Sequence, residues 1–597
     1  MVGISGAKAD ICFEVSFEVC NKVGGIYTVV SSKAEHMMKK YKEYYLFGPY
    51  FENKVLDEFE PYQMPEKFVA TCKKLAQMGI EVYFGRWNIK GKPCVFLFDY
   101  KNFFSKEDEL KKFYWDNFKI DSYGRGYDFS EPMIFATACG IFIELFKSEI
   151  PEKKAIVHCH EWISGFCGLY LKQKNVPVGT VFTTHATMLG RTMSGYDAPL
   201  YANLSNINPY DESYKANIQE KHLTEVACAS NFDVFTTVSP ITALECEKLL
   251  SKKPDVVLLN GLNVSKFPTF EEASIKHKLI REKIRLFNSY FFGPYQKVDY
   301  DNSLFFYTSG RYEYKNKGID LLIKSLGKLN EELKKDEKSK TVYVYFLIPN
   351  GTSGVKNQIV YNKNKLSEIR EYVNRCVYSI EEKLLRNIVN EGEVKIDTFF
   401  SEENKKEIEK LKREFHTKKL SPLLLTHNVW DEQHNAILSA FYANNLVNKQ
   451  DDKVKVVYYP LYAEDNDGVF NLHYYELVSG FHLGVFPSYY EPFGYTPFES
   501  VALSVPAITS DLAGFGRFLR ENDLDNEGVY VLDRMNTSFD DAANKLCTMM
   551  NDFISLDVNS RVDQKIKARD TATHLDWNIL IEKYVEAHNL ALEKRNL

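Results

Sequence analysis

The sequence predicts an α/β protein with two domains, each built on a parallel β-sheet with helices on both faces. The chain has 597 residues, which is too long for one hydrophobic core. From about residue 11 to 265, short apolar segments with strand character alternate with helix-like segments. After a helical stretch, the same alternation begins again near residue 301. These observations predict two α/β domains, joined by a helical connection.

The first domain is expected over residues 1–265. It opens with a strand at 11–19, a turn at Gly24-Gly25 and a helix at 26–40. Paired glycines let the backbone approach a ligand closely, although a plain strand-to-helix turn also explains them. Further strands are expected at 155–158, 180–184, 234–238 and 256–259. Polar residues follow each strand directly, which is typical of the ligand-binding edge of a parallel sheet.

A helical connection is expected over 266–300, followed by a second α/β domain over 301–574. The connection carries apolar residues at helical spacing, namely Ile275, Leu279, Ile284, Phe287 and Phe291. Strands of the second domain are expected at 304–308, 342–347, 454–458, 483–487 and 507–509. The first of them leads through a charged, glycine-flanked loop into a helix that ends near residue 333.

The second domain is interrupted by a helical insertion at about 355–420. Its apolar residues alternate steps of three and four, as in a heptad repeat, at Leu366, Ile369, Val373, Val377, Ile380, Leu384 and Ile388. Ser401 is placed to cap a second helix. A helical hairpin that packs on its own domain would account for this pattern, and so would an oligomerisation element, which we favour.

The segment from Glu491 to Glu499 carries two carboxylates around a Gly-Tyr-Thr-Pro turn, between a strand and a helix expected from Phe498 to Leu503. Such a loop lies at the ligand-binding edge of a sheet, and the helix start offers free N–H groups to a phosphate. Thr496 and Glu499 also fit a capping box, and Glu491 can be an ordinary loop acid. The combination of a phosphate seat and a carboxylate suits chemistry on a nucleotide sugar.

Three basic residues follow strands and can meet in one cleft: Arg191 in the first domain, and Arg311 and Lys317 in the second. Fixed cations stabilise the negative charge that grows on a departing diphosphate, and they can replace a metal ion. His185 also follows a strand. It is either a core or capping histidine, or a group that hydrogen-bonds a sugar hydroxyl or a backbone carbonyl near the reacting carbon.

Composition excludes several other classes of protein. A net charge of −6 argues against a general nucleic-acid surface. The longest apolar stretch, 133–146, contains Glu144 and is too short to span a bilayer. The chain has eleven cysteines and no CxxC pair, and the His158-Cys159-His160 run lacks a second ligand cluster, so no metal site is expected there. Scattered cysteines without a signal peptide indicate a cytoplasmic protein.

Six blocks of sequence resemble eukaryotic-type glycogen synthase, glycosyltransferase family 3. They occur in the family's order, and the match runs along residues 10–595. The blocks are Lys22-Val-Gly-Gly-Ile-Tyr-Thr-Val, His160-Glu-Trp, Thr183-Thr-His-Ala-Thr-Met-Leu-Gly-Arg, Asn260-Gly-Leu-Asn-Val, Gly310-Arg-Tyr-Glu-Tyr-Lys-Asn-Lys-Gly and Val485-Phe-Pro-Ser-Tyr-Tyr-Glu-Pro-Phe-Gly-Tyr-Thr-Pro. The resemblance implies a GT-B fold, in which two Rossmann-like domains face each other across a cleft. It also implies transfer of glucose from UDP-glucose to the 4-hydroxyl of a glycogen or maltooligosaccharide chain end, with retention of configuration and without a metal or other cofactor.

The resemblance also assigns roles to residues. Arg311 and Lys317 would bind the diphosphate, Glu491 would lie by the glucose as the candidate catalytic carboxylate, and His185 would contact the sugar. Donor and substrate contacts are implied for Gly24, Gly25, Arg191 and Glu499, and further contacts are expected from Lys22, His160, Asn260, Gly494, Tyr495 and Thr496. Our hypothesis for retention is front-face substitution, in which the leaving phosphate accepts the proton of the acceptor hydroxyl.

The resemblance further implies a tetramer held by the helical insertion and a glycogenin-type primer protein as partner. The C-terminal helix, at about 575–597, is expected to pack back on the first domain. No nucleic-acid or membrane partner is expected. Two alternatives stay open: a related glucosyltransferase that uses ADP-glucose or another acceptor, and an inactive glycogen-binding scaffold, which the presence of Arg311, Lys317 and Glu491 disfavours.

The sequence departs from the family in the helix that precedes Leu575-Asp-Trp, where relatives carry an arginine-rich site for glucose 6-phosphate. The candidate effector residues here are Arg561, Lys565, Lys567 and Arg569, with lysines at positions where arginines would be expected. Lysine lacks the bidentate phosphate fork of arginine. We therefore expect weak or absent activation by glucose 6-phosphate. The sequence as given ends at Leu597 without a Ser-rich tail, so regulation by tail phosphorylation is not expected.

Overall fold

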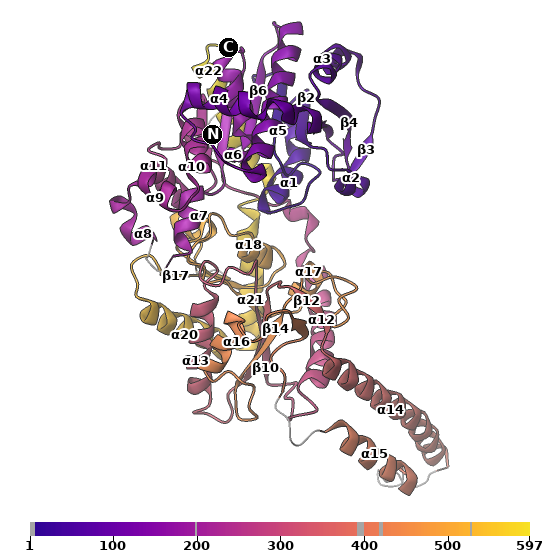
Figure 1. Ribbon diagram of the computed structural model, residues 1–597. Coiled ribbons are helices and arrows are strands. Elements are labelled where there is room, and N and C mark those ends of the chain that lie inside the picture. The colour runs from indigo at the N-terminus through magenta and orange to yellow at the C-terminus, as the bar shows by residue number, and fades with distance from the viewer. Residues whose placement is uncertain (1–5, 197–199, 391–398, 417–421, 526–527) are drawn as a thin grey trace.

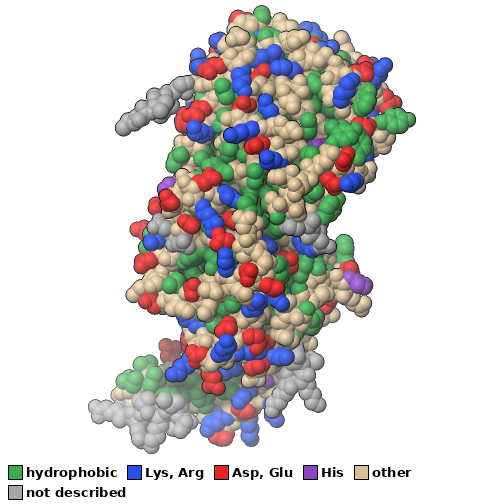
Figure 2. Space-filling view, turned by 90° about the vertical axis from the view of Figure 1, so that its left-hand side faces the viewer, with side chains coloured by type: hydrophobic (Ala, Val, Ile, Leu, Met, Phe, Trp, Pro, Cys, Tyr) green, Lys and Arg blue, Asp and Glu red, His purple; other side chains and the backbone are tan. Residues whose placement is uncertain are grey.

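The computed structural model describes residues 6–196, 200–390, 399–416, 422–525 and 528–597. Two α/β domains are stacked end to end, and a pair of helices projects from the second domain as an arm (Figure 1). On the face seen in Figure 2, acidic and basic side chains are interspersed and do not gather in one basic patch.

The first domain contains a nine-stranded sheet in the order β3-β4-β5-β2-β1-β6-β7-β8-β9. Neighbouring strands run parallel except at the β3–β4 and β4–β5 pairs. The strands are β1 Ile11–Val15, β2 Glu43–Pro49, β3 Phe59–Pro61, β4 Glu81–Trp87, β5 Cys94–Asp99, β6 Ala155–His160, β7 Gly179–Thr184, β8 Val234–Thr237 and β9 Val256–Val257. β1, β6, β7 and β8 are buried along their whole length, as expected for central parallel strands covered on both faces.

Helices cover both faces of this sheet. They are α1 Gly25–Lys40, α2 Glu52–Glu58, α3 Glu66–Gln77, α4 Glu107–Phe118, α5 Tyr127–Glu149, α6 Trp162–Gln173, α7 Met188–Ser194, α8 Leu200–Asn203, α9 Pro209–Lys215, α10 Gln219–Asn231 and α11 Pro240–Leu249. The helix α5 is long and apolar enough to cross a membrane, but most of it is buried in the core of this domain.

The second domain contains a six-stranded parallel sheet in the order β14-β11-β10-β15-β16-β17. Its strands are β10 Ser303–Ser309, β11 Thr341–Leu347, β14 Val454–Tyr459, β15 Leu483–Val485, β16 Ala507–Ser510 and β17 Val529–Leu532, and a separate antiparallel pair is formed by β12 Thr352–Val355 and β13 His427–Val429. Its helices are α13 Ile319–Leu333, α16 Ala436–Ala443, α17 Tyr474–Ser479, α18 Tyr495–Ala502, α19 Gly514–Glu521, α20 Phe539–Ser555 and α21 Val558–Thr573.

Two crossings connect the domains. The first leads through α12 (Phe270–Phe291), which begins with a capping box at Thr269. The second leads from α21 into the last helix, α22 (Trp577–Lys594), which packs on β7 and α1 of the first domain. At the second crossing the backbone N–H of Trp577 donates to Leu262 O at 3.2 Å, and Leu262 N–H donates to Leu575 O, also at 3.2 Å. The two crossings therefore lie side by side.

The arm consists of α14 (Asn357–Val389) and α15 (Glu402–Phe415). Ser401 caps α15 and exchanges hydrogen bonds with Asn404, as a capping box does. Residues 391–398 and 417–421 of the expected insertion lie outside the described residues. Several large apolar side chains of α14 are more than 45% exposed, namely Tyr361, Val373, Val377, Tyr378, Leu385, Ile388 and Val389. Hydrophobic side chains are visible among charged ones at this lower end of the molecule in Figure 2.

Two expected elements differ most from the structure, while the strands expected at 256–259 and 483–487 each end two residues earlier. The strand expected at 11–19 ends at Val15, because the chain turns there and the N–H of Val19 donates to Ser16 O. The helix expected from Phe498 begins at Tyr495, so Thr496 lies inside its first turn. Its N-cap is Gly494, at φ 108°, and no side chain caps it. The capping-box interpretation of Thr496 and Glu499 is therefore wrong.

The attachment of α22 predicts the effect of removing Trp577, which is fully buried and donates from its indole Nε1 to Ser32 Oγ at 2.7 Å. We expect Trp577→Ala to lower the free energy of unfolding by about 3–5 kcal/mol, the usual cost of such a cavity. Urea unfolding followed by circular dichroism measures the loss. Ile579→Ala on the same helix is the control, because Ile579 is 57% exposed, and equal losses for the two variants would contradict the packing described.

Candidate active site

Loops that follow strands of the two sheets meet at the boundary between the domains, which is called the cleft below, and most residues singled out from the sequence lie in these loops. In the first domain they lie after β1, β6 and β7, and in the second after β10 and β15. Contacts between the domains close around the segment that follows β15. Tyr489 OH accepts from Leu200 N–H at 2.7 Å, Tyr495 OH donates to Gly261 O at 3.3 Å, and Ser239 Oγ donates to Pro492 O.

Lys317 and Glu491 form an ion pair between Nζ and Oε2, with only 17% and 15% of their side chains exposed. Their loops are joined through the backbone, because the N–H groups of Tyr489 and Tyr490 both donate to Asn316 O, at 2.8 and 3.0 Å. Gly318 makes this possible. It has φ +65°, and a Cβ there would lie 2.0 Å from Pro487 O, so only glycine permits the contact.

The other two cations also lie at the cleft. Arg311 is 55% exposed on its side chain and pairs with Glu313, with Nη2 2.9 Å from Oε1. Arg191 is exposed in the last turn of α7, where Glu161, Glu313 and Glu491 act on its charge. The two domains thus bring Arg191, Arg311 and Lys317 toward one cleft, and each of them has a carboxylate neighbour.

A carboxylate occupies the start of α1, where the Gly24-Gly25 turn had been expected to seat the donor. Glu18 Oε2 accepts from the N–H groups of Gly24 at 2.7 Å and Tyr27 at 2.9 Å. On the opposite side of the turn, a Cβ on Gly25 would lie 3.8 Å from the ring of Tyr495 in the second domain. The turn therefore lies between the Glu18 carboxylate and α18. Glu18 accepts hydrogen bonds from the N–H groups that an anionic ligand would otherwise use.

Glu499 lies in α18, half-buried, and accepts from Tyr475 OH at 2.7 Å. Loss of solvation raises its pKa to about 7, against the opposing effects of the Tyr475 hydroxyl and the nearby Lys22 ammonium. Lys22 belongs to the first domain, so its effect on Glu499 reports that the Gly24-Gly25 turn and α18 are close. A carboxylate with this pKa changes its charge near neutral pH.

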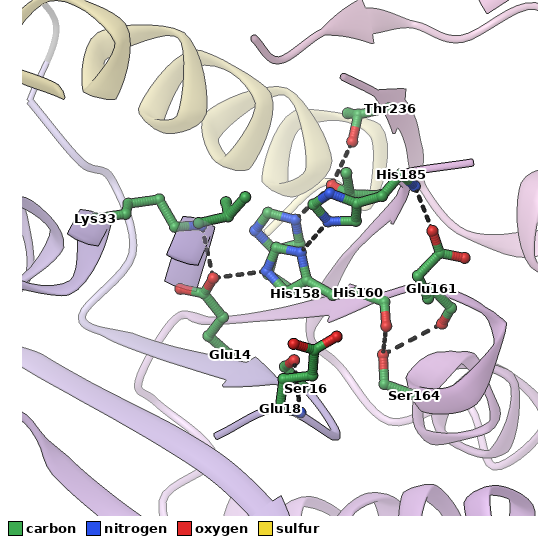
Figure 3. A network of polar contacts seen from close by, with 12 residues as sticks. Glu14, Ser16, Glu18, Lys33, His158, His160, Glu161, Ser164, His185 and Thr236 are labelled. Atoms are coloured by element: carbon green, nitrogen blue, oxygen red, sulfur yellow. Dashed lines mark hydrogen bonds and ion pairs between the residues drawn. The ribbon is translucent and has the colours of Figure 1, made fainter. Parts of the chain in front are cut away.

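The side chains of His185 and His160 point toward each other (Figure 3). His185, at the end of β7, is 9% exposed, and its Nε2 lies 3.0 Å from His160 Nδ1. His160 is fully buried, and its other nitrogen lies 2.6 Å from Glu14 Oε1. Both ring nitrogens of His160 are engaged inside the domain, so its side chain is placed behind the cleft and not, as expected, on the substrate surface.

Glu161 was not singled out from the sequence, yet its geometry marks it as a site residue. It directly follows β6 with φ +64°, a region that non-glycine residues rarely adopt. Its Oε1 accepts from the N–H groups of His185 at 2.7 Å and Ala186 at 3.0 Å. Burial raises its pKa to about 7, and Arg191 partly opposes that rise. Its position directly after a strand was the signal available in the sequence.

Glu245 and Tyr490 are a second pair that sequence reasoning missed. Tyr490 OH, in the second domain, donates to Glu245 Oε2 in the first at 3.1 Å. Burial raises the pKa of Glu245 to about 7, while the hydroxyl groups that donate to it lower the value. Asn260, expected to bind substrate, is buried, and its Oδ1 has no hydrogen-bond partner among the described residues.

The four candidate effector residues do not form one cluster on α21. Arg569 donates to Ala502 O and Val264 O and thereby ties α18 to the first crossing. Lys567 is exposed. Arg561 and Lys565 do lie together, and burial with the nearby charges of Arg281 and Arg561 lowers the pKa of Lys565 to about 7. Only Arg561 and Lys565, with Arg281 of α12, form a concentrated positive charge.

Comparison with known proteins places this cleft in context. The family model described as "Glycogen synthase" matches residues 14–596. The chain belongs to the glycogen synthase family. A "Glycogen [starch] synthase" of Neurospora crassa is 34% identical over 98% of this chain and 84% of its own length. The liver "Glycogen [starch] synthase" of Rattus norvegicus is also 34% identical, over 98% of this chain and 83% of its own length.

Solved structures support the fold. The catalytic domain of starch synthase IV from Arabidopsis thaliana, solved with ADP and acarbose, aligns with 99% of this glycogen synthase family chain and 100% of its own, with a TM-score of 0.51 and 13% identity. At that identity the likeness concerns the fold alone. The family member described here has the GT-B fold, as its sequence motifs predicted.

Proposed function

We propose that this protein is a glycogen synthase that transfers glucose from UDP-glucose to the 4-hydroxyl at the non-reducing end of an α-1,4-glucan, with retention of configuration. The observation that carries the proposal is the family match over residues 14–596, at 34% identity to curated synthases, together with the Lys317–Glu491 pair at the cleft. The partners are then a nucleotide sugar and glycogen or a maltooligosaccharide.

The cations of the cleft would stabilise the departing UDP. Arg311 presents an exposed guanidinium, and Lys317 is held in place by Glu491 and by Gly318. Negative charge grows on the diphosphate as the bond to the sugar breaks, so cations fixed in advance lower the barrier without reorganisation. Arg191 adds a third positive charge from the first domain. We propose that these side chains do the work that a metal ion does in other transferases.

Glu491 is proposed to hold Lys317 and to stabilise the oxocarbenium-like sugar, without bonding to it. A carboxylate already paired with an ammonium group is a poor nucleophile. In front-face substitution, the bond from C1 to the phosphate oxygen breaks while the acceptor hydroxyl attacks from the same side. The proton of that hydroxyl passes to the leaving phosphate oxygen. Isolation of a covalent glucosyl adduct on Glu491 would contradict this mechanism.

The first test follows glucose incorporation into glycogen from UDP-glucose and from ADP-glucose, each with and without glucose 6-phosphate. We expect UDP-glucose to be preferred and the effector to add little. Lys317→Ala should lower kcat on the order of 100- to 1,000-fold, because a charge-stabilising group is lost. Lys335→Ala, a lysine 69% exposed on the second domain, is the control.

Three results would contradict parts of the proposal. Preference for ADP-glucose would support the related glucosyltransferase. Absence of activity with retained glycogen binding would support the scaffold. Strong activation by glucose 6-phosphate would mean that Arg561, Lys565 and Arg281 form a working effector site despite the lysine.

The pKa of Glu499 predicts how donor binding depends on pH. We propose that ionised Glu499 accepts hydrogen bonds from the ribose hydroxyls. Its pKa of about 7 means that the acceptor is lost as pH falls, so KM for UDP-glucose should rise below about pH 7. Steady-state kinetics between about pH 6 and 8 measure this. Glu499→Gln should raise KM and flatten its pH dependence, and an unchanged slope in this variant would exclude Glu499 as the cause.

The exposed apolar face of α14 is proposed to hold a tetramer, as the heptad spacing suggests. We expect the double variant Val373→Asp, Ile388→Asp to dissociate the oligomer, because each aspartate would be buried in the interface. Light scattering measures the mass, and the control is Lys406→Asp on an exposed face of α15. A wild-type mass equal to one chain would rule the tetramer out.

We further propose a cytoplasmic location and a glycogenin-type primer protein as partner. Co-elution of the two proteins on size-exclusion chromatography tests the partner.

A further inference from the structure

Two chains of hydrogen bonds run side by side through the interior of the first domain, behind the cleft (Figure 3). Each passes through a histidine of β6, one through His158 and the other through His160. Only the chain through His160 reaches His185 at the cleft. The chemistry of the groups at its far end decides where every proton in it lies.

The far end is a fully buried ion pair between Lys33 and Glu14, with Nζ 2.6 Å from Oε1 and neither side chain exposed. Tyr44 OH donates to the other carboxylate oxygen at 2.5 Å. Burial alone would raise the pKa of Glu14, but the Lys33 ammonium and the His160 N–H outweigh it and hold the pKa well below its usual range. Glu14 is therefore ionised, and an ionised carboxylate can only accept hydrogen bonds.

The proton positions follow one by one. His160 Nε2 must donate to Glu14 Oε1, at 2.6 Å. Burial lowers the pKa of His160, so its ring is neutral and Nδ1 carries a lone pair. His185 Nε2, 3.0 Å away, must then be the donor to His160 Nδ1. Burial also lowers the pKa of His185 well below its usual value, so the ring is neutral and its Nδ1 is an unprotonated acceptor.

We infer that Glu14 and Lys33 are positioning residues, which act through His160 to fix the tautomer of His185 and so present an unprotonated Nδ1 to the sugar of the donor. This inference rests on the proposed function of the cleft. His185 Nδ1 has no hydrogen-bond partner among the described residues. Its natural partner is a hydroxyl that donates a proton, not a backbone carbonyl, which could only accept.

A metal site does not account for the same residues. The ligand atoms of Glu14, His158 and His160 lie within 4.8 Å of one another. The Lys33 ammonium already supplies a cation there, 2.6 Å from Glu14 Oε1. His158 Nε2 lies 2.7 Å from Thr183 Oγ1, and His160 Nε2 is bound to Glu14, so the nitrogens that would bind a metal are used within the protein.

The neighbouring chain provides a matched control. Tyr41 OH lies 2.7 Å from His588 Nδ1, and His588 Nε2 lies 3.0 Å from His158 Nδ1. From His158 the chain continues through Thr183 and Thr236, whose hydroxyl donates to Phe182 O at 3.1 Å. It is also buried and it includes His588 of α22, but it ends on a backbone carbonyl inside the sheet and does not reach His185.

The first experiment measures the tautomer directly. Nitrogen NMR of protein labelled with ¹⁵N-histidine, with the signals assigned by loss in His185→Gln, should show His185 neutral and protonated on Nε2. A proton on Nδ1, or an imidazolium ring near neutral pH, would overturn the inference. This readout does not depend on synthase activity, so an inactive wild-type enzyme would refute the proposed function and leave the tautomer result intact.

The second experiment removes the ion pair without leaving a buried charge. Replacing both partners by apolar residues of similar size usually preserves folding, so we compare Glu14→Leu with Lys33→Met against the control Tyr41→Phe with His588→Leu. In the Glu14→Leu, Lys33→Met variant, His185 should populate both neutral tautomers. Its kcat should fall by about 10- to 100-fold, the usual effect of losing a residue that orients a site residue, with a smaller change in KM. The control should keep the wild-type tautomer and kcat.

The inference fails if the Glu14→Leu, Lys33→Met enzyme retains the Nε2 proton of His185, or if its kcat stays within about twofold of the control, well short of the expected loss. If that variant does not fold, the wild-type tautomer and Glu14→Asp decide the matter. Glu14→Asp keeps an ionised acceptor and should retain the Nε2 tautomer even at lower stability. Loss of that tautomer in Glu14→Asp would also count against the inference.

Discussion

The contact between the loops after β10 and β15 determines the charged centre of this molecule. Gly318 approaches Pro487 so closely that no side chain fits, and Asn316 O accepts two backbone hydrogen bonds from the segment that leads to Glu491. Backbone packing therefore brings Lys317 and Glu491 together, and the geometry of the pair does not depend on the attraction between the two charges alone. The other groups of the cleft are arranged around a cation whose position is already set.

Carboxylates accompany almost every cation and free N–H group of the cleft. Glu313 pairs with Arg311, Glu491 with Lys317, and Glu18 holds the N–H groups at the start of α1. Such partners reduce the desolvation cost of a cationic cleft. They also mean that an anionic ligand must compete with these carboxylates for several of its contacts. Its binding free energy is then the difference between its own contacts with the cations and N–H groups and those that the carboxylates give up.

The sequence predicted the fold and much of the cleft because both depend on local patterns. Strands followed by polar residues are recognisable along the chain, and Lys317 and Glu491 stand out in loops after strands. Glu161 was missed because its importance lies in its backbone conformation, which no single residue type reveals. His160 was misplaced because its environment depends on Glu14, which is 146 positions away in sequence and paired only through the sheet. Capping at Thr496 was wrong because Gly494 allowed the helix to start two residues earlier.

The last helix belongs to the first domain although the chain reaches it from the second. Polypeptide therefore passes between the domains twice, and the two passages touch at Leu262 and Asp576. A single linker would allow one domain to swivel freely about it. Two strands joined by hydrogen bonds resist twisting and shear and leave bending about one line as the easy motion. Any motion between the domains is accordingly expected to be a hinge bend at these two crossings, which would change the separation of Gly25 and Tyr495 without sliding one domain across the other.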